Sequence, residues 1–278
     1  MPESAHFFAS PASWGLRRLN QEKKPDDTLI EIDRVTFGYD SSRLILNDIS
    51  LKFPRGKITA ILGGSGCGKT TLMRLIAGVH GVNAGRVVFD GVVLDHRDKA
   101  QMFRLRRRLG MLFQFGALFT DLTVFDNVAF PLREHTDLPE ALIRDIVLMK
   151  LNAVGLRGAA SLRISEVSGG MARRIALARA IALDPELIMY DEPFAGLDLI
   201  SMGVAAKLIR TLNDVTGSTS LVVSHDVPEC MAISDYVVLM AVGGRIVAHG
   251  SPKELMASPD PETRQFTRGE PDGPVKFH

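Results

Sequence analysis

The chain has few cysteines, no excess of charge of either sign and no long apolar run. Its two cysteines, Cys67 and Cys230, are far apart among 278 residues, which excludes a disulfide framework and is typical of a reducing compartment. Lys and Arg number 33 against 32 Asp and Glu, for a net charge of +1. A dedicated nucleic-acid binder usually has a basic excess, so we expect no nucleic-acid partner.

A membrane span and a secretion signal are also missing. No stretch approaches the roughly 18 consecutive apolar residues that a spanning helix needs. Near the N-terminus, Glu3 comes early and the Phe7-Phe8 patch is too short for the apolar part of a signal peptide. We therefore expect a chain that is soluble by itself, although its partners need not be.

Hydrophobic residues make up 46% of the chain, enough for a substantial core in one large domain or two lobes. Residues 1–27 lack periodicity and predict a loose extension, and residues 28–257 predict one ordered domain. Within that domain, strands alternate with helices, which indicates an α/β fold with a mainly parallel sheet. Residues from about 115 to 183 predict an inserted helical lobe. The tail 258–278 is expected to fold, if at all, against something else.

A glycine-rich loop follows a short β-branched strand and precedes a predicted helix. Its sequence is Gly63-Gly64-Ser65-Gly66-Cys67-Gly68-Lys69-Thr70, which fits the pattern G-x-x-x-x-G-K-[ST] of phosphate-binding loops. The glycines let main-chain N–H groups wrap around phosphates, and the next helix presents its positive N-terminus to the same anion. We expect this loop, with Thr71, to bind ATP. Lys69 would reach the β- and γ-phosphates, and the Thr70 hydroxyl would bind Mg²⁺.

Cys67 occupies a variable position of this loop. It stands near a helix N-terminus and near Lys69, which favours the thiolate. The sequence therefore predicts a lowered pKa and a reactive thiol whose alkylation inhibits ATP hydrolysis. The alternative is that Cys67 is merely a small residue.

Polar residues follow three further predicted strands. Asp191-Glu192 ends an apolar strand; after a phosphate loop, this pattern predicts that Asp191 holds Mg²⁺ and that Glu192 polarises an attacking water. Gln114 ends a strand and could bind Mg²⁺ or water through its amide. His225 follows the strand 220–224 and is expected to face the γ-phosphate. Alone, Gln114 and His225 would more often be structural; their order along the chain favours catalysis.

The segment Ser168-Gly169-Gly170-Met171 opens a predicted amphipathic helix, 23 residues before Asp191. A helix start offers free N–H donors and a positive dipole end to an anion. Few proteins with a phosphate loop continue with this segment and then with an acidic strand end.

Together these residues resemble the nucleotide-binding subunits of ABC transporters over roughly residues 28–257. The resemblance implies a RecA-like core, an antiparallel β subdomain and an inserted helical subdomain. It makes Gln114 the Q-loop, Ser168–Met171 the signature, Asp191-Glu192 the Walker B pair and Asp198 the D-loop. It places Tyr39 where an aromatic stacks on adenine, although an ordinary strand aromatic is an equal alternative. It also implies a head-to-tail dimer, in which the signature of one copy covers ATP on the other.

A narrower resemblance is visible in three segments: residues 112–119, residues 124–135 and Ser168-Gly169-Gly170-Met171-Ala172-Arg173-Arg174. They are similar to the ATPases of MCE-type transporters, which move phospholipids between the inner and outer membranes and maintain outer-membrane lipid asymmetry. This resemblance implies an integral-membrane permease, a periplasmic MCE protein and a small STAS-domain protein as partners. It also implies a position on the cytoplasmic face of a bacterial inner membrane.

Three alternatives stay open. The first is an ABC ATPase for another cargo, such as amino acids, metals or lipoproteins. The second is an ABC protein of DNA repair, chromosome structure or translation, which the single phosphate loop and the spacing of about 100 residues to Ser168 disfavour. The third is a nucleotide binder without catalysis, which Glu192 disfavours.

Overall fold

The computed structural model describes residues 27–40, 43–270 and 272–274. The predicted extension therefore lies, except for residue 27, outside the described residues. The larger of two sheets has the order β10-β9-β3-β8-β7-β6. In chain order its strands are β3 (Ile58–Gly63), β6 (Leu109–Leu112), β7 (Leu187–Asp191), β8 (Thr219–Ser224), β9 (Tyr236–Ala241) and β10 (Arg245–Gly250).

This sheet is parallel except at one edge, where β10 pairs antiparallel with β9. Every residue of β3 and of β8 is buried, as expected of central parallel strands covered on both faces. The prediction of a mainly parallel sheet is confirmed. Because parallel strands end at the same edge, the residues after β3, β7 and β8 meet there.

The smaller sheet is antiparallel, with the order β2-β1-β4-β5. Its strands are β1 (Thr28–Phe37), β2 (Leu46–Pro54), β4 (Ala84–Phe89) and β5 (Val92–Val93). Its buried side chains form one apolar core with side chains from one face of the large sheet and with those of α2 (Lys69–Ile76). Arg108, beside β6, bridges the two sheets, since its guanidinium donates to both carboxylate oxygens of Glu186 and to Asp90.

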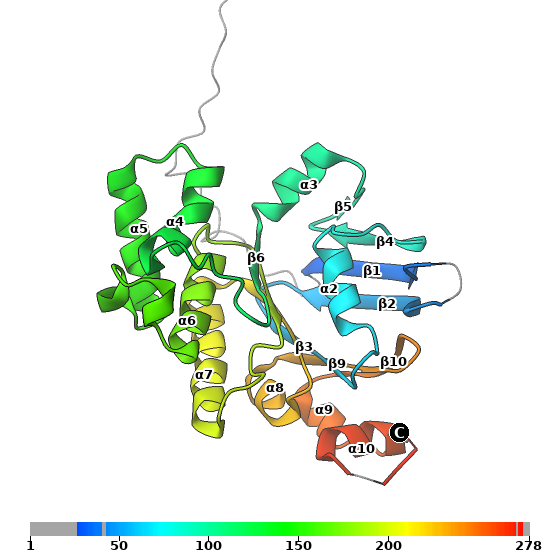
Figure 1. The fold of residues 1–278 in the computed structure, drawn as a ribbon. Coiled ribbons are helices and arrows are strands. Elements are labelled where there is room, and N and C mark those ends of the chain that lie inside the picture. The colour runs from blue at the N-terminus through cyan, green and yellow to red at the C-terminus, as the bar shows by residue number, and fades with distance from the viewer. Residues whose placement is uncertain (1–26, 41–42, 271, 275–278) are drawn as a thin grey trace, which may run out of the picture.

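Helices α4 (Val124–His135), α5 (Glu140–Ala153) and α6 (Gly169–Ala180) gather on one side of the molecule (Figure 1). Buried residues of all three, among them Val128, Val147 and Ile175, belong to one apolar cluster. Two short 3₁₀ turns, Arg157–Ala159 and Ile164–Glu166, join α5 to α6. This is the inserted helical subdomain that the resemblance implied.

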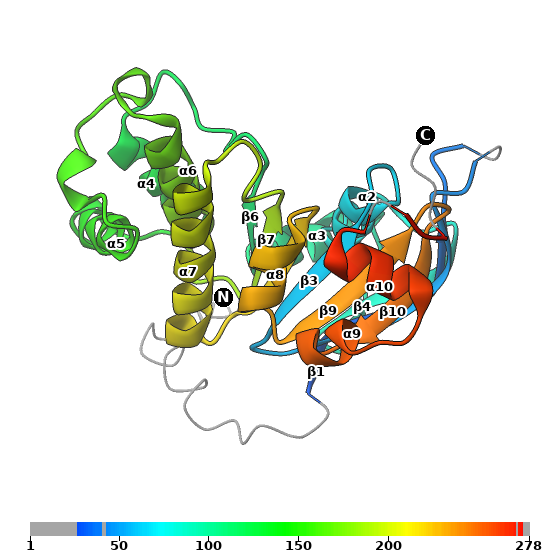
Figure 2. The ribbon, with the colours of Figure 1, turned by 90° about the horizontal axis from the view of Figure 1, so that it is seen from below.

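The remaining helices cover the large sheet or its rim. They are α3 (Lys99–Arg106), α7 (Leu199–Thr216), α8 (Val227–Ile233), α9 (Pro252–Met256) and α10 (Pro261–Arg268). Figure 2 shows α7 beside α6 and shows α9 and α10 against the β9–β10 side of the sheet. Among the described residues, no helix is long and apolar enough to cross a membrane.

The tail departs from its prediction, because residues 261–268 fold on their own chain. Helix α10 starts at Asp260, whose carboxylate accepts from the Thr263 amide at 2.7 Å, and Pro261 occupies its first turn. Thr263 is fully buried, and Arg245 of β10 pairs with Glu262 at 2.7 Å. The expectation that this segment folds only against something else is wrong, since it is capped by its own residues and packs on its own chain.

Candidate active site

The glycine loop joins β3 to α2 as predicted. Gly68 precedes the helix with φ of 101°, a left-handed conformation that favours glycine. A Cβ atom at this position would lie 2.7 Å from Cδ2 of Leu46, so the loop has no room for a side chain there. Lys69, which is buried, donates from Nζ to the carbonyls of Gly63 at 2.7 Å and Gly64 at 3.1 Å.

A cavity of about 700 Å³ opens beside this loop. It is lined by Arg43, Ile45, Ser65, Gly66, Cys67, Gly68, Lys69, Thr70, Thr71, Gln114, Glu192 and His225. The structure thus brings the loop together with three residues predicted from separate strand ends. Arg43 and Ile45 were not predicted, because they lie in the connection between β1 and β2 and belong to no motif.

Asp191 contacts Thr70, which lines the cavity. The Thr70 hydroxyl donates to Oδ1 of Asp191 at 3.3 Å. Burial raises the pKa of Asp191, although the hydrogen bond from Thr70 opposes the shift. A hydroxyl, a carboxylate and the Gln114 amide oxygen form a hard oxygen donor set, which fits Mg²⁺. These residues could therefore hold the metal ion of a nucleotide.

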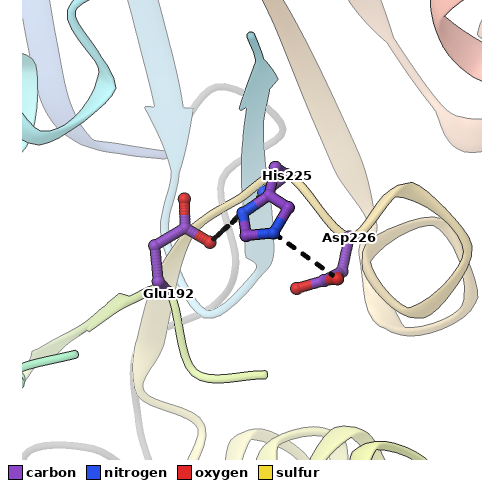
Figure 3. A group of neighbouring side chains, drawn as sticks. All are labelled: Glu192, His225 and Asp226. Carbon is purple, nitrogen blue, oxygen red and sulfur yellow. Dashed lines mark hydrogen bonds and ion pairs between the residues drawn. The ribbon is translucent and has the colours of Figure 1, made fainter. Parts of the chain in front are cut away.

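Glu192 contacts His225 directly (Figure 3). Oε2 of Glu192 lies 2.8 Å from Nδ1 of His225, and it also accepts from the Ser224 hydroxyl at 3.1 Å. The Glu192 side chain is 14% exposed and that of His225 is 61% exposed. Glu192 has a left-handed backbone with φ of 49°, which costs a residue with a Cβ atom free energy. A carboxylate held this way, facing a cavity, could accept a proton from water.

Two neighbours of this pair were not singled out from the sequence. Ser224 donates to Oδ2 of Asp226 at 3.0 Å as well as to Glu192, and Nε2 of His225 lies 4.0 Å from Oδ1 of Asp226. The Ser-His-Asp order was visible in the chain, but only the parallel register of β7 and β8 places Ser224 next to Glu192. Ser224 and His225 therefore contact the same carboxylate oxygen of Glu192, Oε2.

The Ser168–Met171 segment does not line this cavity. Ser168 caps α6, since its hydroxyl accepts from the Met171 amide at 3.2 Å. Ser168, Gly169 and Gly170 are exposed, and a Cβ atom at either glycine would meet nothing within 4 Å. Asp198 likewise lies outside the cavity and caps α7 by accepting from the amides of Ile200 and Ser201 at 3.0 Å. Neither segment therefore lines the cavity beside its own phosphate loop.

Tyr39 lies at the rim of the cavity. Its side chain is 55% exposed, and its hydroxyl lies 3.4 Å from that of Thr71, a lining residue. The Thr71 contact lowers the pKa of Tyr39. The ring packs edge-on against Phe37 and His80. This position is compatible with stacking on a base and equally with an aromatic cluster at a strand end.

Cys67 corrects a prediction. Its side chain is fully buried, and burial raises the pKa of its thiol even though Lys69 opposes the shift. Desolvation of the thiolate outweighs the nearby cation. The predicted lowered pKa and reactive thiol are therefore wrong, and Cys67 is a small residue that fills the loop.

A family model described as "ABC transporter" matches residues 46–195. The chain belongs to the ABC transporter family. It is 57% identical over 249 residues to the "Intermembrane phospholipid transport system ATP-binding protein MlaF" of Escherichia coli strain K12, a match that covers 90% of this chain and 92% of that protein. Membership in this family makes the chain an ATPase that binds ATP.

Solved structures agree with this ABC ATPase in fold. The cbiO1 protein of Clostridium perfringens, "part of the ABC transporter complex cbiONQ", has a TM-score of 0.79 at 30% identity, covering 84% of this chain and 92% of its own. A dimer of the ATP-binding cassette MJ0796, in "a post-hydrolysis state" with ADP and Pi, has a TM-score of 0.72 at 26% identity, covering 80% and 98%.

Proposed function

We propose that the chain is the ATP-hydrolysing subunit of a transporter that moves phospholipids between the inner and outer membranes and so maintains outer-membrane lipid asymmetry. The observation that carries this proposal is the 57% identity to the E. coli MlaF protein along nearly the whole of both chains. Identity at this level extends well beyond the phosphate loop and Walker B residues that all such ATPases need. It therefore supports a shared cargo as well as a shared reaction.

The reaction takes place in the cavity beside the glycine loop. Main-chain amides of residues 63–68 and the Lys69 ammonium bind the phosphates. Thr70, Asp191 and Gln114 would hold Mg²⁺, which supplies positive charge at the β- and γ-phosphates. Glu192 takes a proton from the attacking water, and His225 stabilises charge on the γ-phosphate. The hydrogen bonds of Glu192 to Ser224 and His225 fix the carboxylate before ATP arrives.

Two copies complete two sites. The exposed amides of Gly169 and Gly170, the Ser168 hydroxyl and Met171 cover the γ-phosphate held by the other copy, and Asp198 lies at the same interface. The dimer of the related cassette supports this arrangement, as does the exposure of the signature outside its own cavity. Closure would convert ATP binding into movement of the attached permease.

The surface for the permease follows Gln114. Phe115 is 90% exposed, and Phe119 and Phe130 are 38% and 39% exposed with ring centroids 4.7 Å apart. Exposed aromatic side chains grouped this way are typical of a protein contact. We place the chain on the cytoplasmic face of the inner membrane, held there by the permease. A periplasmic MCE protein and a small STAS-domain protein on the ATPase complete the proposed assembly.

Affinity purification from membranes tests the cargo. A tagged chain should retain a permease and an MCE-domain protein, and the complex should contain extracted phospholipid. Recovery of a permease with an amino-acid, metal or lipoprotein binding partner in place of the MCE protein would favour another cargo. A Phe115→Ser variant should lose the permease and keep ATP binding, because Phe115 does not line the cavity.

A further inference from the structure

Arg173 lies on α6, five residues after Ser168, and contacts three separate main-chain carbonyls. Its Nη1 donates to Pro193 at 3.1 Å, and its Nη2 donates to Ala195 at 2.7 Å and to Gln114 at 3.4 Å. The guanidinium is half-buried, and burial lowers its pKa. A half-buried cation needs acceptors, and here its hydrogen bonds go to the backbone of two loops.

The two loops belong to the active site. Pro193 and Ala195 lie one and three residues after Glu192, in the connection from β7 to α7 that also contains Asp198. Gln114 lies two residues after the end of β6, and Gln114 and Glu192 both line the ATP cavity. Arg173 itself does not line it. Arg173, on helix α6, therefore forms hydrogen bonds to the backbone of both loops that carry the cavity residues Gln114 and Glu192.

In the head-to-tail dimer, the helix and the loop serve different nucleotides. Ser168 at the start of α6 covers the ATP of the other copy, whereas Glu192 acts on the ATP of its own copy. We propose that Arg173 is a positioning residue that links the two ATP sites of the dimer, by holding the Pro193–Ala195 turn, and with it Glu192, to the helix that presents Ser168. This inference rests on the proposed function, because it needs the second copy.

The geometry favours arginine in this role. The planar guanidinium reaches Pro193 and Ala195 at once from a fixed fork, which an ammonium on a flexible stem does less well. The bond to Ala195 is the shortest of the three, so the strongest restraint is on the turn after Glu192. Movement of Ser168 onto the partner's nucleotide would be passed through one rigid helix to that turn.

Arg174 provides a matched control on the same helix. It has the same charge and a similar half-buried position, but its Nη1 donates to the Val154 carbonyl at 3.3 Å, at the end of α5. That contact stays within the helical subdomain and touches neither loop of the cavity. Loss of Arg174 thus removes a guanidinium and a carbonyl contact without removing the link.

The test uses the complete transporter with the wild-type chain, Arg173→Ala, Arg173→Lys or Arg174→Ala. ATP hydrolysis is measured against ATP concentration, and binding is measured with a fluorescent ATP analogue. We expect kcat of Arg173→Ala to fall about tenfold, because a misplaced catalytic group is costly. Its KM and nucleotide affinity should stay close to wild type, and its cooperativity in ATP should be lost. Arg173→Lys should recover part of kcat, and Arg174→Ala should resemble wild type.

Three results would overturn the inference: unchanged kcat and cooperativity in Arg173→Ala, the same loss in Arg174→Ala, or a wild-type transporter without cooperativity. If Arg173→Ala does not fold, Arg173→Lys carries the comparison, and full wild-type kinetics in that variant would count against the fork geometry. A wild-type transporter that does not hydrolyse ATP would instead refute the proposed function.

Discussion

The ATP cavity and the signature surface, formed by Ser168, Gly169 and Gly170, differ in how many of their polar groups already have a partner within the chain. In the cavity, Lys69, Thr70 and Glu192 already contact partners within the chain, at distances of 2.7 to 3.3 Å. On the signature surface, Ser168 caps its own helix, while Gly169 and Gly170 face open space. One region is organised before any ligand arrives, and the other offers donors that have no acceptor in the described part of the chain.

This difference separates binding from turnover. Changes in the cavity should alter what a single copy does with ATP. Changes on the signature surface should leave a single copy unaffected and alter only the assembled dimer. Three variants test that separation, and a labelling experiment on Cys67 follows them, in order from the largest expected effect to the smallest.

Glu192→Gln should have the largest effect. The amide keeps the shape of the carboxylate but cannot accept the proton of water, so we expect kcat to fall roughly 100- to 1000-fold. ATP binding should persist and the closed dimer should accumulate, as size-exclusion chromatography with ATP can show. Glu229→Gln, on α8 outside the cavity, is the control. Near-normal turnover in Glu192→Gln would remove this residue as the base.

Lys69→Ala should weaken nucleotide binding itself. The ammonium forms charge-assisted hydrogen bonds to phosphate, and their loss should lower ATP affinity roughly 10- to 100-fold. Equilibrium binding to the isolated chain measures this effect without the dimer. Lys57→Ala, one residue before β3 and half exposed, should bind ATP normally. Equal affinities for Lys69→Ala and wild type would refute the assignment of the glycine loop.

Ser168→Ala should lower turnover about tenfold, because one donor to the γ-phosphate is lost. ATP affinity of the isolated chain should not change. The substitution also removes a helix cap, which costs about 1 kcal/mol of stability. Thr123→Ala removes the comparable cap of α4 and serves as the control for that cost. If both variants lose the same activity, the effect is one of stability, and the signature surface has no separate role.

The smallest expected effect concerns Cys67, whose thiol should not react with a maleimide in the native protein. Burial raises the pKa of its thiol, so little thiolate is present at neutral pH and the sulfur is closed to solvent. We expect a maleimide to leave both thiols of the native ATPase unmodified over minutes and to label them after denaturation, as mass spectrometry can count. Rapid labelling of Cys67 in the native protein, with loss of ATPase activity, would support the original prediction of a reactive thiol.

Much of the cavity could be predicted because its signals are local. The glycine loop needs only a strand, left-handed glycines and a helix start, and all of these are visible between residues 58 and 76. The roles of Gln114, Asp191 and His225 were predicted from strand ends, because parallel strands end at one edge. The capping pattern Asp260-Pro261 with Gly269 beyond the helix was also readable, and it would have predicted α10.

Other features depend on packing between distant segments. The burial of Cys67 arises because the loop folds against the end of β9, where a Cβ atom at Gly63 would meet both the Met240 carbonyl and the Cys67 sulfur. Arg173 contacts loops 59 and 20 residues away, and no spacing rule predicts those contacts. The ring contacts of Tyr39 with Phe37 and His80 suit both interpretations of this residue, stacking on adenine and an ordinary strand aromatic.

The left-handed backbone of Glu192 has different consequences for stability and for catalysis. A glycine at this position would relieve strain of about 1 kcal/mol, and it would also lose the hydrogen bonds from Ser224 and His225, which stabilise the native chain by a similar amount. The same change would remove the carboxylate that we propose deprotonates the attacking water. Selection of variants for heat resistance alone would therefore tolerate loss of this carboxylate, whereas selection for growth that depends on the transporter would restore it.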